Sequence, residues 1–449
     1  MHGQGIGRRA RLAVASLALL GLVAAACGSD DGNGDSATTA STEPAVKITG
    51  VPGVTDTQIR FAAIGTITGN PTGACTLACF ADGVHAYFDY RNSQGGIFGR
   101  ELVLAETLDD ELGKNKDRAL EIVSSDDIFG AFASPVLATG WADLAKARIP
   151  LFAWNIVAGE AAADSIFTNN GVVCRTCLQR DVPYVVKLAG AKKVATLGYG
   201  VSSSSKTCAE TYARSIDHYS DEIGGAKTVY TNASLEFGLP NGVGPEVTAM
   251  KKAGVDFVFG CLDLNGMKAV AQELARQEFQ VPLLHRGSYD ADFIEQGGTL
   301  FEGNYVEAHF RPFEATTSGT SLGAFKKWMA KRDKPLTEPA MYGWIAADEA
   351  YTGLKLAGQP FDREKVIDAL NTKATNYTAG GLIPPLDFSR NHLPPTETDL
   401  SHALRYECNV FLKVHDGKMT IVGGTTEKPF VCFPGGQSTW TEPTLRNFE

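Results

Sequence analysis

The segment Ile59-Arg60-Phe61-Ala62-Ala63-Ile64 decides the fold, because it starts a long series of short apolar runs that alternate with amphipathic stretches. We expect this run to form a buried strand. The stretch at 78–93 is expected to form a helix, because its apolar side chains recur every three or four residues and so share one face. Strands that alternate with helices usually build parallel sheets covered by helices on both faces. The segment therefore predicts an α/β fold.

The same alternation continues along the chain. Further strands are expected at 102–104, 128–133, 150–153, 194–197, 228–230, 256–260 and 282–284. Further helices are expected at 116–124, 136–148, 182–189, 206–223, 264–277, 320–332, 340–357 and 362–371. A hairpin is expected at 411–422, with its turn at Asp416-Gly417. Because a chain of this length exceeds what one hydrophobic core usually holds, we expect two lobes.

The N-terminus indicates export. Arg8, Arg9 and Arg11 precede an apolar run at 12–26 that is shorter than the roughly 20 residues of a membrane-spanning helix. We therefore expect a signal peptide at 1–26, followed by a disordered polar tether at 27–50. The end of the run resembles a bacterial lipobox, which implies that Cys27 carries the lipid. Simple secretion is the alternative, and the export route stays open.

The cysteines indicate disulfides. Besides Cys27, the chain contains Cys75, Cys79, Cys174, Cys177, Cys208, Cys261, Cys408 and Cys432. An even number in an exported protein favours disulfides over a zinc site or a redox motif. We expect Cys208 to pair with Cys261 and Cys408 with Cys432, because the strands that lead to these positions should be neighbours.

Composition and motifs exclude several classes of function. The chain is 44% hydrophobic and 20% charged, and its net charge of −10 argues against nucleic-acid binding. The sequence has no GxxxxGK[ST] loop, no HExxH, no GxSxG and no GxGxxG after the first expected strand. We therefore expect no catalytic activity, no cofactor and no metal.

Several short segments carry a family resemblance through their order and spacing. They are 59–69, 94–100, 109–110, 130–134, 149–150, 174–176, 192–195, 254–258 and 362–366. Together they resemble the type I solute-binding proteins of ABC transporters, in the branch of the branched-chain amino acid and amide receptors. The lipoprotein start agrees with this resemblance.

The resemblance implies two Rossmann-like lobes joined by a three-strand hinge, with crossovers near 175, 307 and 380. Lobe 1 would comprise 58–174 plus 308–380, and lobe 2 would comprise 175–307 plus 381–449. Ligands of parallel α/β sheets bind at the carboxyl ends of the strands, so the cleft should lie between the lobes, among the loops that follow strands.

Carried over position by position, the resemblance implies nine ligand-binding residues. They are Ser134, Pro135, Trp154, Asn155, Tyr199, Ser202, Ser203, Asp263 and Tyr289. Hydroxyl and backbone N–H groups suit a carboxylate or amide oxygen, and an acid such as Asp263 suits an ammonium. Several of these residues also have a structural reading, as an N-cap for Ser134, Ser202 or Asp263 and as a packing aromatic for Trp154 or Tyr289. Trp154 stands where amino-acid receptors have small residues, so the ligand is not inherited from the family.

The resemblance also implies a function. We expect an extracytoplasmic, membrane-anchored protein that captures a small polar molecule by hinge closure and delivers it to an ABC permease with its ATPase subunits. The alternative is a sensory receptor that presents closure to a signalling membrane protein.

Overall fold

The computed structural model describes residues 46–155, 160, 162–170, 177–394 and 407–449. The expected signal peptide, Cys27, most of the tether and Cys174 lie outside these residues. The described part belongs to one compact unit of the chain. Within it, every helix is too short or too polar to cross a membrane.

The first sheet is wholly parallel and has the strand order β2-β1-β3-β4-β5. Its strands are β1 (Gln58–Gly65), β2 (Glu101–Asp109), β3 (Gly130–Ser134), β4 (Leu151–Asn155) and β5 (Ile166–Asn170). Alternate residues of β1 point to opposite faces, as the two-residue period of a strand requires. Phe61 and Ala63 join the core on one face, whereas Ala62 and Ile64 join a separate core with Trp141 on the other.

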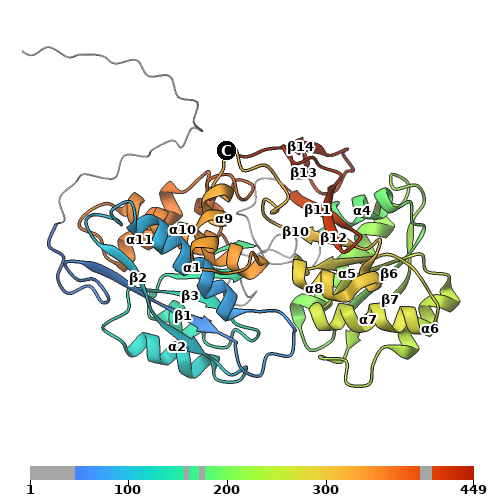
Figure 1. The fold of residues 1–449 in the computed structure, drawn as a ribbon, viewed down its shortest axis with the longest axis horizontal. Coiled ribbons are helices and arrows are strands. Elements are labelled where there is room, and N and C mark those ends of the chain that lie inside the picture. Colours follow the sequence, from blue (N-terminus) through green and yellow to red (C-terminus); the bar gives the residue numbers. More distant parts are fainter. Residues whose placement is uncertain (1–45, 156–159, 161, 171–176, 395–406) are drawn as a thin grey trace, which may run out of the picture. The chain divides into compact units, whose positions relative to one another are not determined.

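Helices cover both faces of this sheet (Figure 1). The helices are α1 (Leu77–Asn92), α2 (Asn115–Ser124), α3 (Trp141–Lys146), α9 (Leu322–Lys331), α10 (Glu338–Ala357) and α11 (Arg363–Lys373). Helices α2 and α3 pack together on the face of Ile64, and α1 and α10 pack on the face of Phe61. The last three helices therefore return to the first sheet although they follow the second sheet's strands in the sequence.

The second sheet has the order β14-β13-β11-β10-β9-β8-β6-β7, and β12 pairs with β11. Its strands are β6 (Lys193–Tyr199), β7 (Lys227–Leu235), β8 (Phe257–Cys261), β9 (Leu283–Arg286), β10 (Tyr305–Ala308), β11 (Glu407–His415), β12 (Lys418–Val422), β13 (Phe430–Phe433) and β14 (Thr444–Arg446). Strands β6 to β10 are parallel, and the C-terminal strands join antiparallel to β10. The second sheet therefore combines a parallel centre with an antiparallel edge.

The helices of the second sheet are α4 (Asp181–Ala189), α5 (Ser203–His218), α6 (Gly244–Ala253), α7 (Leu264–Arg276) and α8 (Ala291–Gly297). Phe257 and Phe259 of β8 face the core formed with α4 and α5, whereas Val258 faces the core formed with α6 and α7. The expected α/β fold with parallel-sheet lobes is thus confirmed.

Several expected elements differ in detail. The helix expected at 136–148 is shorter, because residues 135–140 form turns and α3 begins only at Trp141. Gly140 permits a close approach there, since a Cβ on it would lie 2.5 Å from the Cβ of Ala119. Strands β5, β10, β13 and β14 and helices α6 and α8 were not expected.

Two glycines bring α1 and α10 into backbone contact. A Cβ on Gly83 would lie 1.8 Å from the carbonyl oxygen of Ala340, and a Cβ on Gly343 would lie 1.9 Å from that of Phe80. Only glycine allows such an approach. The two helices, which are side by side in Figure 1, are therefore held at a fixed separation.

The segments near two of the expected crossovers lie beside one another. The backbone N–H of Arg311, just after β10, donates to the carbonyl of Leu382 at 2.6 Å, and its buried side chain donates to Gly381 at 3.0 Å. Residues 171–176, near the third expected crossover, lie outside the described part. Phe388 packs on Phe167 of the first sheet, so this stretch contacts lobe 1 although it follows the expected boundary at 380. The division into lobes at these residues stays a prediction.

Two expected disulfides are confirmed. Cys208 pairs with Cys261, and Cys408 pairs with Cys432. Cys408 and Cys432 are directly opposite in the β11–β13 ladder, so the second bridge joins the hairpin to a third strand and does not cross the hairpin itself. A third disulfide joins Cys75 to Cys79 just before and within the first turn of α1. Cys177 is also disulfide-bonded.

Candidate functional site

A small cavity of about 50 Å³ lies where strands of both sheets end. It is lined by Ala74, Cys75, Thr76, Ser134, Trp154, Leu264, Gly287, Tyr289, Asp290, Glu338, Pro339 and Tyr342. Ser134 is the last residue of β3, Trp154 lies near the end of β4, and Gly287 directly follows β9. This is the position at which parallel α/β sheets bind ligands.

Glu338 places a buried carboxylate in this cavity. It is the first residue of α10, where the hydroxyl of Thr337 caps the helix by accepting from the N–H of Ala340. Its oxygens accept from the N–H of Tyr289 at 3.3 Å and from the hydroxyl of Tyr342 at 3.2 Å. Burial raises the pKa of Glu338 to about 7. The carboxyl group therefore titrates near neutral pH.

Aromatic rings form much of the remaining wall. The rings of Trp154 and Tyr342 lie 5.7 Å apart at an angle of 37°. The hydroxyl of Tyr289 donates to Glu314 and accepts from the N–H of Phe313, both at 2.5 Å. Burial raises the pKa of both tyrosines well above the ordinary value. Both phenols are therefore neutral, and their rings supply apolar, polarisable surface.

The loop that precedes α1 reaches across to the second sheet's helix α7. The side chain of Asn265 donates to the carbonyl of Pro71 at 2.8 Å, and its backbone N–H donates to the carbonyl of Thr72 at 3.1 Å. Gly73 packs against the same asparagine and has a φ of +80°. The Cys75–Cys79 disulfide holds the end of this loop beside the cavity. The loop thus links the two groups of elements at the cavity's edge.

Three of the nine predicted ligand-binding residues line this cavity, namely Ser134, Trp154 and Tyr289. Pro135 follows Ser134 and is half-buried, outside the lining. Asn155 ends β4, and its side chain lies outside the described part. The cavity therefore brings together residues of β3, of β4 and of the loop after β9.

The remaining four predicted residues have structural contacts elsewhere. Tyr199 is buried with its ring against Phe237. Ser202 caps α5, Ser203 is exposed on its first turn, and the carboxylate of Asp263 caps α7 by accepting from the N–H of Gly266 at 2.8 Å. They are not among the residues that line the described cavity, and their role in binding stays a prediction.

Glu338 and Tyr342 were not predicted from the sequence as binding residues. Both belong to a helix that is remote in the sequence from the strand-end loops, and an acid in the first turn is ordinarily a partner of the helix dipole. The Thr337-Glu338-Pro339 helix start is the available signal, but it marks the helix and not the cavity.

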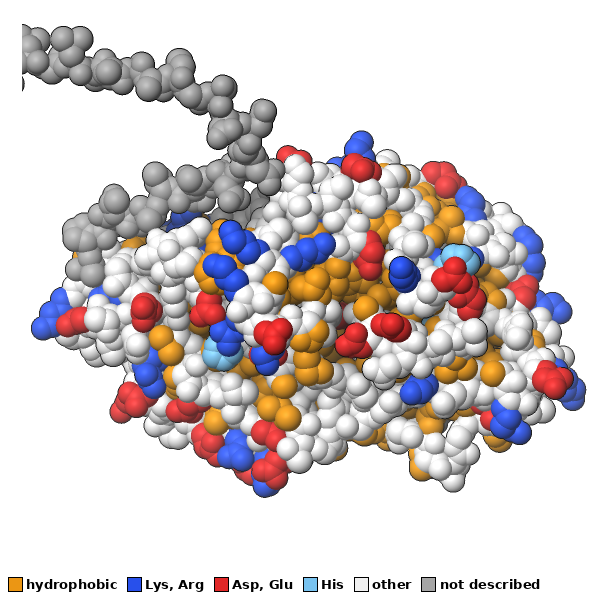
Figure 2. Space-filling model, in the orientation of Figure 1, with side chains coloured by type: hydrophobic (Ala, Val, Ile, Leu, Met, Phe, Trp, Pro, Cys, Tyr) orange, Lys and Arg blue, Asp and Glu red, His pale blue; other side chains and the backbone are white. Residues whose placement is uncertain are grey.

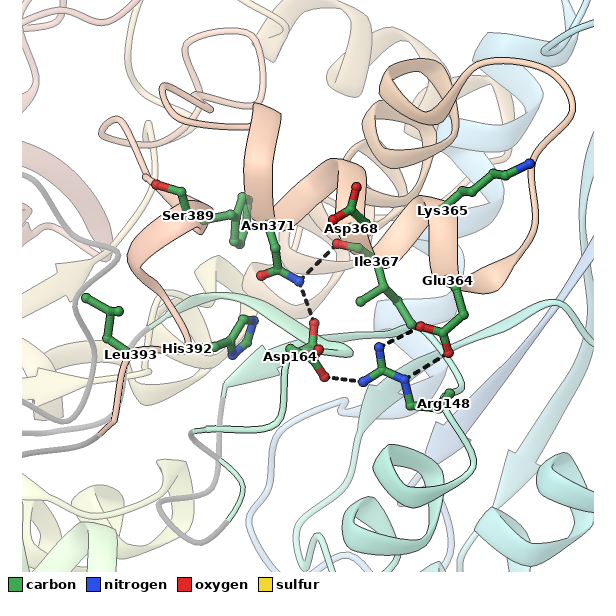
Figure 3. A pocket seen from close by; sticks show the side chains of 11 residues that line it. Arg148, Asp164, Glu364, Lys365, Ile367, Asp368, Asn371, Ser389, His392 and Leu393 are labelled. Atoms are coloured by element: carbon green, nitrogen blue, oxygen red, sulfur yellow. Dashed lines mark hydrogen bonds and ion pairs between the residues drawn. The ribbon is translucent and has the colours of Figure 1, made fainter.

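A larger hollow of about 540 Å³ lies elsewhere, beside α11 (Figure 3). Arg148 points at Glu364 and donates to its two oxygens at 2.9 and 2.7 Å, and it also pairs with Asp164. These ion pairs raise the pKa of Arg148 and lower that of Glu364. Because these charged groups are partly exposed and satisfy one another, the hollow has the character of a solvated surface groove.

The surface around the elements carries charges of both signs. On the face shown in Figure 2, acidic and basic side chains are interspersed over both groups of elements.

Two helix-covered sheets, one parallel and one with a parallel centre, and a cavity at their strand ends define the type I class of bilobal binding proteins. A model of the periplasmic binding protein family matches residues 58–399. The chain belongs to this family. No curated protein matches the sequence.

Solved structures share the fold at low sequence identity. A fatty acid ABC transporter substrate-binding protein from Thermomonospora curvata has a TM-score of 0.62 and 17% identity, over 89% of this chain and 98% of that chain. A branched-chain amino acid ABC transporter protein from Thermus thermophilus with bound valine has a TM-score of 0.61 and 16% identity, over 87% and 97%. A solute-binding protein from R. palustris in complex with benzoate has a TM-score of 0.61 and 16% identity, over 87% and 98%.

Proposed function

We propose that this protein is the extracytoplasmic substrate-binding lipoprotein of an ABC importer. It captures a small polar solute, such as an amino acid, an amide or a related compound, and delivers it to a permease that is driven by separate ATPase subunits. The observation that carries this proposal is the cavity lined from both sheets, with Ser134 and Trp154 on one side and Tyr289 on the other. Solved relatives of the same fold that bind valine and benzoate support it.

Capture works through hinge closure. A ligand that contacts both lobes binds the closed state better than the open state, and so it shifts the population toward closure. The bonds between Asn265 and the loop before α1 then form together with the ligand contacts. The permease recognises the closed form, and the binding protein performs no chemistry on its cargo.

Closure is tested by small-angle X-ray scattering of the purified protein with and without a saturating ligand. Ligand should reduce the radius of gyration and raise the melting temperature. A ligand that binds by calorimetry but leaves the scattering profile unchanged would contradict the hinge mechanism.

The cavity is tested by Trp154→Ala, which removes an aromatic wall. We expect ligand affinity to fall by about 1 kcal/mol or more, as for loss of a buried aromatic anchor. Trp440→Ala is the matched control, because Trp440 is also half-buried but packs on Tyr219, away from the cavity lining. Equal affinities of the two variants would remove Trp154 from the site.

The anchor is tested separately. The full-length chain expressed in a bacterial host should incorporate a radiolabelled fatty acid, and Cys27→Ser should abolish both the label and membrane retention. Labelling that persists in Cys27→Ser would contradict the lipoprotein assignment.

A further inference from the structure

The charged side chains at the cavity are all of one sign. Among the described residues that line it, Asp290 and Glu338 are acidic, and none is lysine, arginine or histidine. The nearest basic group along this loop is Arg286, whose Nε lies 2.9 Å from a carboxylate oxygen of the buried Glu307. Its charge is therefore already balanced, and the described lining residues offer no free cation to an anionic ligand.

We infer that the cavity binds an organic ammonium compound, whose charged nitrogen faces Glu338 between the rings of Trp154, Tyr289 and Tyr342. This inference rests on the proposed function and specifies the ligand class of the same site. It also assigns the ammonium contact to Glu338 and not to Asp263, whose carboxylate caps α7.

The charge of Glu338 is not balanced by the groups that contact it, and this favours a cationic ligand. Its two hydrogen bonds come from neutral donors, the N–H of Tyr289 and the hydroxyl of Tyr342. Asp290 and Glu307 are among the charged groups that act on it, and both are acids that raise its pKa further. A buried carboxylate without a counter-charge is costly, so a bound cation would supply what the protein itself does not.

The aromatic side chains that line the cavity also favour an ammonium ligand. Ammonium groups bind to the faces of tryptophan and tyrosine rings through cation–π attraction, which strengthens when water is excluded. Trp154 and Tyr342 present two tilted rings at the cavity, and Tyr289, from the loop after β9, also lines it, with its hydroxyl held by Glu314. A carboxylic acid without an amine would instead meet two acidic side chains in a desolvated space.

The test is a thermal-shift and calorimetry screen at pH 8, where Glu338 is ionised. The panel pairs each amine with an acid of similar skeleton, so that leucine and 3-methylbutylamine are compared with 4-methylpentanoate. It also includes quaternary amines such as choline. The variants are Glu338→Gln, which is nearly isosteric, and Glu295→Gln, an exposed carboxylate on α8 that serves as the matched control.

We expect every stabilising compound to carry a cationic nitrogen. Glu338→Gln should weaken its binding at least about tenfold, as for loss of a hydrogen bond to a charged group, while Glu295→Gln leaves it unchanged. Binding of amine-free acids, or ammonium binding that Glu338→Gln does not alter, would overturn the ammonium inference and leave the binding-protein function standing. A broad panel in which nothing binds would count against both.

Discussion

Gly73 offers a sharp test of whether the loop before α1 latches the closed form. A Cβ on this residue would lie 2.6 Å from the side-chain oxygen of Asn265. Gly73→Ala should therefore push the asparagine away and break its hydrogen bond to Pro71. Gly69→Ala is the matched control, because Gly69 lies in the same loop with a similar φ of +73° but its Cβ would lie 3.8 Å from the nearest neighbour, the carbonyl oxygen of Glu111.

The magnitude follows from the lost bond. Both alanines must adopt a left-handed backbone conformation, and this strain is present whether the lobes are open or closed. Only Gly73→Ala also removes a contact that exists in the closed form. One hydrogen bond contributes about 0.5–1.5 kcal/mol, so ligand affinity should fall about 2- to 12-fold relative to Gly69→Ala.

The assay is isothermal titration with the most strongly stabilising compound from the ammonium screen. Asn265→Ala removes the same side-chain hydrogen bond without altering the loop. Because both variants remove one and the same bond, the double variant should lose no more ligand affinity from it than either single variant. Equal affinities of Gly73→Ala and Gly69→Ala, or fully additive losses in the double variant, would refute the latch.

Three further predictions concern the stability of the ligand-free protein. The pKa of Glu338 is about 7 in the folded protein, against an ordinary value of 4.5. Because the folded state binds this proton more tightly, the contribution to stability is fully present below about pH 4.5 and is lost as the pH rises through 7. The unfolding free energy of the wild type, relative to that of Glu338→Gln, should thus fall between about pH 5 and pH 8. The fall should reach at most about 3 kcal/mol, since one pKa unit corresponds to about 1.4 kcal/mol. A difference in melting temperature that stays constant with pH would contradict this prediction. Replacing Cys208 and Cys261 with serine should lower the unfolding free energy by about 2–5 kcal/mol in urea titrations. This loss should exceed that from removing the Cys75–Cys79 disulfide, because the two bridges close sequence separations of 53 and 4 residues. Equal losses from the two disulfides would contradict this prediction. Gly343→Ala should lower the unfolding free energy by about 1–3 kcal/mol despite the better helix propensity of alanine, because the new Cβ meets a backbone carbonyl. An unchanged urea midpoint would show that α1 and α10 can move apart without cost.

The buried centre of the fold was predictable from the sequence because its strands are strongly apolar. Strands β1, β3 and β8 form continuous buried runs, and such runs between turns are a clear local signal. Strand β5 was missed because three of its five residues, 168–170, are polar and it joins the sheet at the edge. Helix α6 was missed because it begins with Gly244-Pro245 and buries only Val247 and Met250.

The candidate site was only partly predictable, because some of its residues lie at strand ends and others lie on the returning helix α10. Residues at strand ends, such as Ser134 and Trp154, could be located because parallel sheets bind ligands there. Glu338 and Tyr342 reach the cavity only because α10 returns to pack on α1 and β4, which is a tertiary contact without a local signal. The capping serines and aspartates have the same composition as ligand-binding loops, so the sequence could not separate the two roles.

The glycine contact between α1 and α10 also bears on redesign. Because Thr76 precedes one helix and Glu338 begins the other, their spacing at the cavity is set by Gly83 and Gly343, which let the two helix backbones touch. This half of the site is a rigid template that the chain presents before any cargo arrives. An engineer who wants a new specificity should therefore keep both glycines and vary side chains of the loop after β9, whose exchange leaves the contact between α1 and α10 in place.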